Sequence, residues 1–304
     1  MAIESPMRLP DLRSAPALYV TSDYSGEHRG ASFQVLSILI TDPSRCEQWL
    51  RARNEVRREF LSDGRRMSFK QLRDRQRAEA LVPWLRAADL IPGICFAIGI
   101  ERNYGSMFDP PAPLNLSHPS FAPYAKWPRA TLEKACRLCH FVGLTVAAMA
   151  SPGQDVFWYT DEDEIASHAQ RLRELVNLFA WVSSHYLTVD LRHLRVGTTA
   201  MDDGSRLVED LASIPDLVAG AVSEVLARKT AENVTLTDTL LWPVSEPTDK
   251  AMTVLSWLGT IPAELKRLSC VVESTGPSES TVSFLKFSLE EGLEPKAVST
   301  AEVR

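Results

Sequence analysis

The stretch VFWYTDEDEI, Val156 to Ile165, decides how this sequence folds, because an apolar and aromatic run ends in four consecutive acidic residues. The run from Asp155 to Thr160 has the composition of a short buried strand. Asp161 is then the first residue beyond that strand. Because four adjacent carboxylates repel one another, a positively charged group or ion is expected beside them.

A second predicted strand ends in an acidic residue near the start of the chain. The segments ALYVTSD, Ala17 to Asp23, and ASFQVLSILIT, Ala31 to Thr41, are apolar and rich in β-branched residues, and the turn-forming YSGEHRG lies between them. They are predicted to form a hairpin. Asp23 is the last residue of its first strand.

The order of the predicted elements indicates a fold class. If residues 43–89 are set aside, the order is strand, strand, strand, helix, strand, helix, strand, helix, as in the ribonuclease H-like fold. The first and fourth strands of such a sheet are parallel neighbours, so Asp23 and Asp161 should meet at the edge where α/β sheets bind ligands. The other predicted elements are a strand at Leu90 to Ile100, helices at Arg129 to Met149 and Glu162 to Tyr186, a strand at Thr188 to Thr199, and one or two helices in SRLVEDLASIPDLVAGAVSEVLA, which contains Pro215.

The predicted architecture is therefore an α/β, ribonuclease H-like mixed sheet flanked by helices, with its core in residues 15–230. Residues 43–89 form an arginine-rich helical insertion in that core. Met107 to Pro128 contains six prolines and is expected to be a long surface loop. Residues 231–304 are expected to form a small accessory extension with a flexible polar tail, a helix near Ala251 to Leu258, and strands near Leu268 to Val272 and Thr281 to Phe287.

The composition is that of an ordinary globular protein, since 45% of the 304 residues are hydrophobic and 24% are charged. The N-terminus lacks a basic start followed by an apolar core, so no signal peptide is expected. No uncharged run reaches the roughly 18 to 20 residues of a membrane helix, so no membrane partner is expected either. Five cysteines, an odd number, do not suggest a disulfide framework. The cytoplasm is the expected compartment.

The formal net charge of −6 is unevenly distributed. The segment from Arg45 to Arg86 holds twelve basic and six acidic residues, so it carries +6 and the rest of the chain carries −12. A basic face of this kind binds phosphate backbones, and the alternative is a solvated helical face. Three arginines of this segment, Arg73, Arg75 and Arg77, are predicted to follow the backbone of a nucleic acid.

Four short blocks resemble a known family. LYVTSDYSG, MSFKQLRD, VFWYTDEDEI and EDLASIPDLVAGAV are similar to blocks of the bacterial "domain of unknown function 3800" family, which has the ribonuclease H-like fold, and the resemblance covers Ala17 to Leu226. The family's first block commonly has a second acid where this chain has Tyr24. Its last block carries an Asp in a helix, and Asp216 takes that place. Lys70 matches the block that contains it.

The resemblance implies a metal-dependent phosphodiesterase site. Phosphodiester cleavage in this fold class uses two Mg²⁺ or Mn²⁺ ions about 4 Å apart. Asp23 would bridge both ions, Asp161 would bind one, and Asp216 or Glu209 would complete the site. Glu209 and Asp216 are seven residues apart, so they share one side of a continuous helix. Lys70 would hold a phosphate.

Each of these acidic residues also has a structural alternative. Asp23 could start a turn before Ser25 and Gly26. Asp216 follows Ser213 at the spacing of a capping box. Within the acidic run, Glu162 to Glu164 could favour the positive N-terminus of the next helix.

The run CRLCH, Cys136 to His140, has the spacing that attaches c-type haem, but core packing of two small residues within a helix is the expected explanation. No second cysteine pair, histidine pair or phosphate-binding loop accompanies it. Neither haem nor zinc is therefore expected. Any step driven by a nucleoside triphosphate would need a protein partner such as an ATPase.

The sequence thus predicts a nuclease that uses Mg²⁺ or Mn²⁺ and clustered carboxylates to hydrolyse RNA or DNA. One alternative is a non-catalytic interaction module in a defence or mobile-element assembly, whose arginine-rich helices bind another protein. Another is an enzyme that hydrolyses a small phosphorylated substrate with the same acids.

Overall fold

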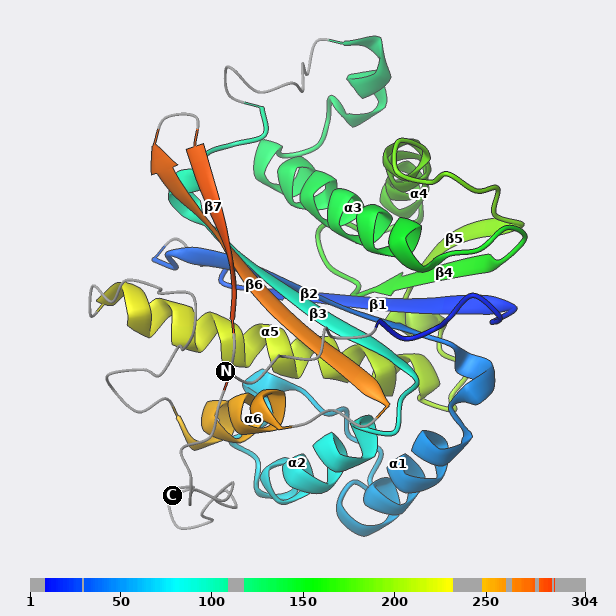
Figure 1. The fold of residues 1–304 in the computed structure, drawn as a ribbon, viewed down its shortest axis with the longest axis vertical. Coiled ribbons are helices and arrows are strands. Elements are labelled where there is room, and N and C mark those ends of the chain that lie inside the picture. Colours follow the sequence, from blue (N-terminus) through cyan, green and yellow to red (C-terminus); the bar gives the residue numbers. More distant parts are fainter. Residues whose placement is uncertain are drawn as a thin grey trace, which may run out of the picture.

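The computed structural model describes residues 9–28, 30–108, 118–231, 248–260, 264–276, 279–285 and 287. These residues form a seven-stranded mixed sheet with six α-helices packed on its two faces (Figure 1). The strand order is β5-β4-β1-β2-β3-β6-β7. The strands are β1 (Ala17–Ser25), β2 (Phe33–Thr41), β3 (Gly93–Glu101), β4 (Asp155–Thr160), β5 (His193–Thr198), β6 (Leu265–Gly276) and β7 (Glu279–Phe284).

The pairing of the strands places the ends of β1 and β4 together. β1 is antiparallel to β2 and parallel to β4, and β4 is parallel to β5. The prediction that the first and fourth strands are parallel neighbours is therefore confirmed. β6 pairs in parallel with β3, and β7 pairs with β6, so part of the predicted accessory extension enlarges the core sheet. The predicted polar tail, residues 288–304, lies outside the described residues.

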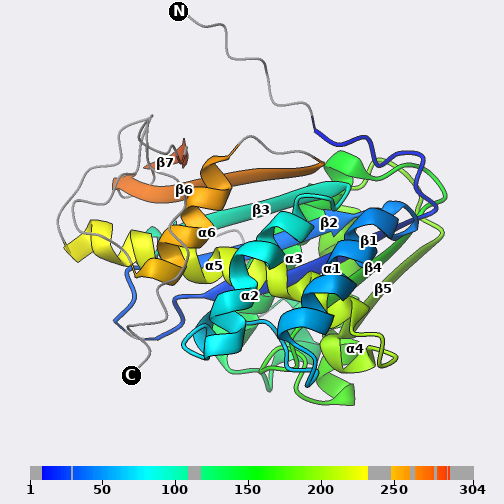
Figure 2. The ribbon, with the colours of Figure 1, turned by 90° about the horizontal axis from the view of Figure 1, so that it is seen from below.

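Helices cover both faces of the sheet. One face carries α3 (Arg129–Met149) and α4 (Ala169–Ser184), and the other carries α1 (Glu47–Phe60), α2 (Arg75–Ala88), α5 (Leu207–Ala231) and α6 (Asp249–Gly259). Figure 2 views the molecule from the second side, where α1, α2 and α6 lie over α5. In the described part of the chain, no helix is both long enough and apolar enough to cross a membrane.

The alternation of β1 directs Asp23 toward α5. Leu18 and Val20 belong to the core beneath α3 and α4. Thr21 points the other way and donates a hydrogen bond to α5. Because side chains alternate along a strand, Asp23 lies on the same face as Thr21.

The helix α5 continues through Pro215 without a break. Proline has no backbone N–H, so it leaves the carbonyl of Leu211, four residues earlier, without its helical partner. The hydroxyl of Thr21 donates to that carbonyl at 3.2 Å. This contact joins α5 to β1 and favours the single helix over the two helices that Pro215 also allowed.

Three predictions need correction. The strand predicted at Thr188 to Thr199 begins only at His193. α4 begins at Ala169 and not at Glu162, because residues 161–168 form turns before the helix. The capping alternative for Asp216 is wrong, because Ser213 and Asp216 both lie in the interior of α5. In the predicted proline-rich loop, a short 3₁₀ helix spans Pro119–Tyr124, and residues 109–117 lie outside the described part.

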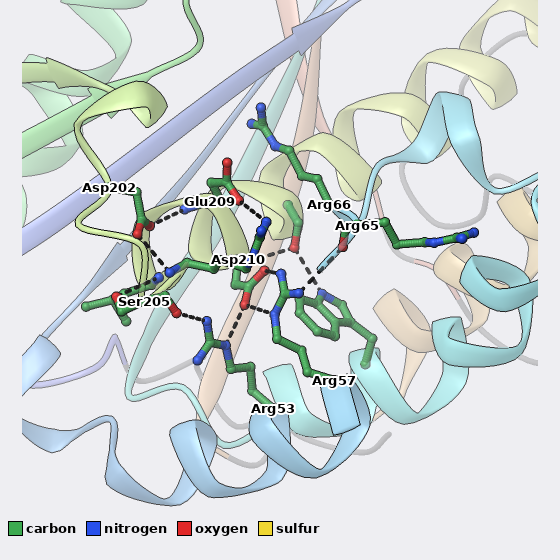
Figure 3. A network of polar contacts seen from close by, with 12 residues as sticks. Arg53, Arg57, Arg65, Arg66, Asp202, Ser205, Glu209 and Asp210 are labelled. Atoms are coloured by element: carbon green, nitrogen blue, oxygen red, sulfur yellow. Dashed lines mark hydrogen bonds and ion pairs between the residues drawn. The ribbon is translucent and has the colours of Figure 1, made fainter. Parts of the chain in front are cut away.

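A buried charged group holds the arginine-rich insertion against α5 (Figure 3). Asp210 of α5 is fully buried and accepts hydrogen bonds from Arg53 and Arg57 of α1, including one from Nε of Arg57 at 2.6 Å. Arg53 also donates to the carbonyl of Ser205. Two of the insertion's arginines are therefore internal, so they are not part of a basic surface.

We expect Asp210→Ala to lower the free energy of unfolding by about 3 to 5 kcal/mol, because it leaves two buried guanidinium groups without their anion. Urea unfolding followed by circular dichroism measures the change. Glu47→Ala is the control, since it breaks the exposed ion pair with Arg51 and should cost less than about 1 kcal/mol. Equal losses in the two variants would contradict this account.

Candidate functional site

Asp23 lies near the carboxyl end of β1, which continues to Ser25, and it pairs with Ser37 of β2. The prediction that Asp23 ends its strand and the alternative that it starts a turn are therefore both wrong. The parallel pairing of β1 with β4 ends at Thr21 and Tyr159, and Asp161 follows the last residue of β4. Asp161 is close enough for its charge to raise the pKa of Asp23.

The carboxyl groups of Asp23 and Asp216 are close enough for each to shift the pKa of the other. Burial raises the pKa of Asp23 well above its usual value, and the charges of Asp216 and Asp161 raise it further. Burial also raises the pKa of Asp216, against the opposing effect of hydrogen bonds from Phe69 and Ser68. Two carboxyl groups in contact cannot both carry a free negative charge at low cost, so the pair requires a shared proton or a cation.

The segment after α1 brings its backbone to Asp216. The N–H of Phe69 donates to Oδ2 of Asp216 at 2.7 Å. Gly220 of α5 allows this approach, because a Cβ atom at that position would lie 2.2 Å from Cδ1 of Phe69. Lys70, the next residue, is exposed, and its charge lowers the pKa of Asp23. Lys70 is thus close enough to act on Asp23, and its role in holding a phosphate stays a prediction.

Asp161 has a cationic partner. Nη2 of Arg66 donates to Oδ1 of Asp161 at 2.6 Å, and the hydroxyl of Thr199 donates to the same oxygen at 3.3 Å. Burial lowers the pKa of Arg66, but the charges of Asp161, Glu209 and Asp216 outweigh that effect, so its pKa is raised overall. Sequence reasoning missed Arg66, because it is one of eleven arginines in the insertion and no spacing distinguishes it.

Glu209 lies at the margin of this group. It forms an ion pair with Arg206 at 3.1 Å, and Figure 3 shows it beside Arg66. Its contact with Arg206 connects it to the loop before α5. Of the four acids predicted for the site, Asp216 and Asp161 both raise the pKa of Asp23. Glu209 is near enough to Arg66 to raise the pKa of that guanidinium.

The three arginines predicted to hold a nucleic acid differ in their surroundings. Arg73 is exposed, and Arg75 is exposed but paired with Glu79 at 2.8 Å. Arg77 is only partly exposed, and its Nε donates to the carbonyl of Arg66 at 2.7 Å. The Arg77 side chain therefore supports the backbone of the site, whereas Arg73 and Arg75 face solvent.

A second cationic side chain, that of Lys134, forms ion pairs with later residues of the acidic run. Nζ of Lys134, a buried residue of α3, lies 2.8 Å from Asp163 and 2.9 Å from Glu164. It also lies 3.7 Å from the centre of the Tyr24 ring, and the Tyr24 hydroxyl donates to Asp163. The alternative in which Asp163 and Glu164 favour a helix N-terminus is thus wrong, because α4 begins later and both acids bind Lys134.

The two cysteines of CRLCH are core residues. Cys136 and Cys139 are buried in α3, and burial raises the pKa of both thiols, that of Cys136 to about 12. His140 contacts the Tyr186 hydroxyl through Nδ1 at 2.7 Å. Core packing, the explanation expected from the sequence, accounts for the buried cysteine pair.

Asp23 and Asp216 are the described carboxylates that could contribute to a cation site. Within the described residues, no three or more histidine, cysteine, aspartate or glutamate side chains are grouped so as to hold a metal ion, and Asp161 is bound by Arg66. Mg²⁺ in proteins is commonly held by one or two carboxylates together with waters and substrate phosphates. A cation at Asp23 and Asp216, or at a set of three or four carboxylates, stays a prediction.

Comparison with known proteins adds no family. No protein-family model matches the sequence, and no curated protein is significantly similar to it. The resemblance of the four sequence blocks therefore stays a prediction. What the site can do has to be argued from its geometry.

We expect Asp23→Asn to raise the free energy of unfolding by about 0.5 to 2 kcal/mol at pH 7 in metal-free buffer, because it removes one of two like charges in contact. The pKa of Asp23 is higher in the folded chain than its unfolded value of about 3.9. The folded state therefore binds more protons between these values, and stability falls as the pH rises through that range. The gain from Asp23→Asn should accordingly vanish below about pH 3.9.

Urea unfolding over a pH series measures this difference. Asp210→Asn is the matched control, because the same chemical change on α5 removes a charge that Arg53 and Arg57 neutralise and should lower the stability at pH 7. A loss of stability at pH 7 in both variants would show that Asp23 is not under repulsion.

Proposed function

We propose that this protein is a divalent-metal-dependent nuclease with a ribonuclease H-like fold that hydrolyses phosphodiester bonds of RNA or DNA. The observation that carries the proposal is the interaction between the partly buried carboxyl groups of Asp23 and Asp216, which both have a raised pKa, together with the charge of Asp161 that raises both pKa values further. Bringing these carboxylates together costs electrostatic free energy unless a cation or a proton reduces their charge. Perturbed carboxylates that gather at the carboxyl edge of an α/β sheet are characteristic of functional sites.

The order of the strands supports the fold assignment. β3, β2, β1, β4 and β5 are consecutive neighbours, with β2 antiparallel to β1 and with β4 and β5 parallel to it. This arrangement is the one expected from the order of elements in the sequence. It also agrees with the proposed membership in the "domain of unknown function 3800" family, whose acidic positions correspond to Asp23, Asp161 and Asp216.

In this proposal, Asp23 of β1 and Asp216 of α5 would hold the cation. A bound Mg²⁺ or Mn²⁺ would supply a water of lowered pKa and would stabilise the leaving oxygen. Lys70, whose charge acts on Asp23, and Arg73 are exposed and would contact phosphates of the strand, which positions it without reading its sequence. The Phe69 N–H and the Ser68 side chain orient Asp216.

We expect Asp23→Asn and Asp161→Asn each to reduce Mn²⁺-dependent cleavage of labelled RNA or DNA by about 100-fold or more, because each removes a carboxylate from the cation's surroundings. Gel electrophoresis measures cleavage, calorimetry measures Mn²⁺ binding, and circular dichroism verifies folding. Asp63→Asn, an exposed acid paired with Arg65, is the control and should leave cleavage unchanged.

Two results would oppose the proposal. A wild-type chain that neither binds Mn²⁺ nor cleaves either nucleic acid would favour the non-catalytic interaction module. A fully active variant with both substitutions would show that cleavage depends on other residues.

A further inference from the structure

Hydrogen bonds hold the backbone on either side of Arg66 at the candidate site. The carbonyl of Arg66 accepts a hydrogen bond from Nε of Arg77 at 2.7 Å, and the carbonyl of Arg65 accepts one from Nη1 of Arg57 at 3.5 Å. Three residues later, the Phe69 N–H binds Asp216. These contacts fix the backbone from which the Arg66 side chain extends toward Asp161.

The other arginines around α5 are engaged elsewhere. Arg53 and Arg57 bind the buried Asp210, and Arg65 binds Asp63 and Asp74. Arg206 pairs with Glu209 at the margin of the site. Arg66 pairs with Asp161, whose charge acts on Asp23, so among these arginines it is the one paired with a neighbour of the proposed reaction centre.

The ion pair between Arg66 and Asp161 is open to exchange. The two side chains are 35% and 38% exposed, respectively, and a partly exposed ion pair contributes little net stability. Within the described part of the chain, the guanidinium binds Asp161 through Nη2, which leaves most of its five N–H donors for another acceptor. A phosphate offers two oxygens at the spacing that a guanidinium fork matches.

We infer that Arg66 is a phosphate-binding residue of the site, which serves as the counter-ion of Asp161 in the free chain and transfers to a phosphodiester of the substrate. The inference rests on the proposed function and adds to it the residue that receives the phosphate nearest the carboxylates. A cation that binds Asp161 would release the guanidinium. Cation and polymer binding would then reinforce each other.

The test measures binding without catalysis. Fluorescence anisotropy of a short labelled single-stranded oligonucleotide is followed in EDTA over a series of salt concentrations, with the full chain and with variants Arg66→Ala, Arg66→Lys and Arg51→Ala. Arg66→Ala should weaken binding several-fold and lower the salt slope by about 0.7, the value for one lost phosphate contact. Arg66→Lys should retain part of the affinity and exclude misfolding as the cause. Arg51→Ala is the matched control, because Arg51 is exposed and paired with Glu47, and it should change binding less.

The counter-ion role has its own measurement. Asp161→Asn frees the guanidinium, so it should tighten oligonucleotide binding in EDTA more than the control Asp63→Asn does. Arg66→Ala should abolish that gain in the Asp161→Asn background. The inference fails if Asp161→Asn tightens binding equally with and without Arg66, or if Arg66→Ala and Arg51→Ala have equal effects.

Failure of the inference and failure of the proposed function give different results. Cleavage with Mn²⁺ that requires Asp23, combined with binding that is insensitive to Arg66, refutes the role of Arg66 alone. Binding that depends on Arg66 without any cleavage refutes the nuclease and leaves a nucleic-acid-binding protein.

Discussion

The hydrogen bond from the Thr21 hydroxyl to the carbonyl of Leu211 is the contact on which the candidate site depends. Pro215 frees this carbonyl from the helical ladder, and a buried carbonyl without a donor is costly. The central strand β1 supplies the donor, so α5 is fixed on the sheet next to the strand end that carries Asp23. Asp216, the residue after Pro215, is thereby brought to Asp23. A proline that interrupts the helical hydrogen bonds thus provides the contact that positions an acid.

Charge around α5 is divided between two carboxylates with opposite environments. Asp210 is buried with two arginines, which neutralise it and join the insertion to the core. Asp216 lies close to Asp23, which shifts its pKa, and Arg66 pairs with the neighbouring Asp161. The charge of Asp210 is neutralised within the chain. Asp23 and Asp216 instead have raised pKa values, which is the kind of perturbation on which the proposed function rests.

Much of the sheet follows from local patterns, whereas the partners of the charged residues do not. The run ending at Thr160 and the hairpin from Ala17 are strongly apolar, so their strands and the meeting of Asp23 with Asp161 are predictable. The sequence pattern could not show which arginines bind acids of the core or the site. Arg53 and Arg57 bind Asp210 and Arg66 binds Asp161 because of tertiary contacts that no local spacing indicates. The pattern also could not show that Lys134, from a helix earlier in the chain, binds the acidic run. A local stretch of sequence does not indicate which residue of a distant segment will form an ion pair with it.

The acidic run after β4 meets two cations that act on opposite faces of the sheet. Lys134 is buried in α3 and binds the later acids, which fixes the chain leaving β4 and, through Tyr24, the end of β1. Arg66 is half-exposed and binds the first acid, Asp161, on the face that α5 covers. Lys134 is only 4% exposed, so losing its acidic partners would leave a buried ammonium group uncompensated, whereas Arg66 is 35% exposed and can exchange its partner for water or solvent ions. Lys134 can therefore keep the chain at Asp163 in place while Asp161 changes partner, as the proposed role of Arg66 requires.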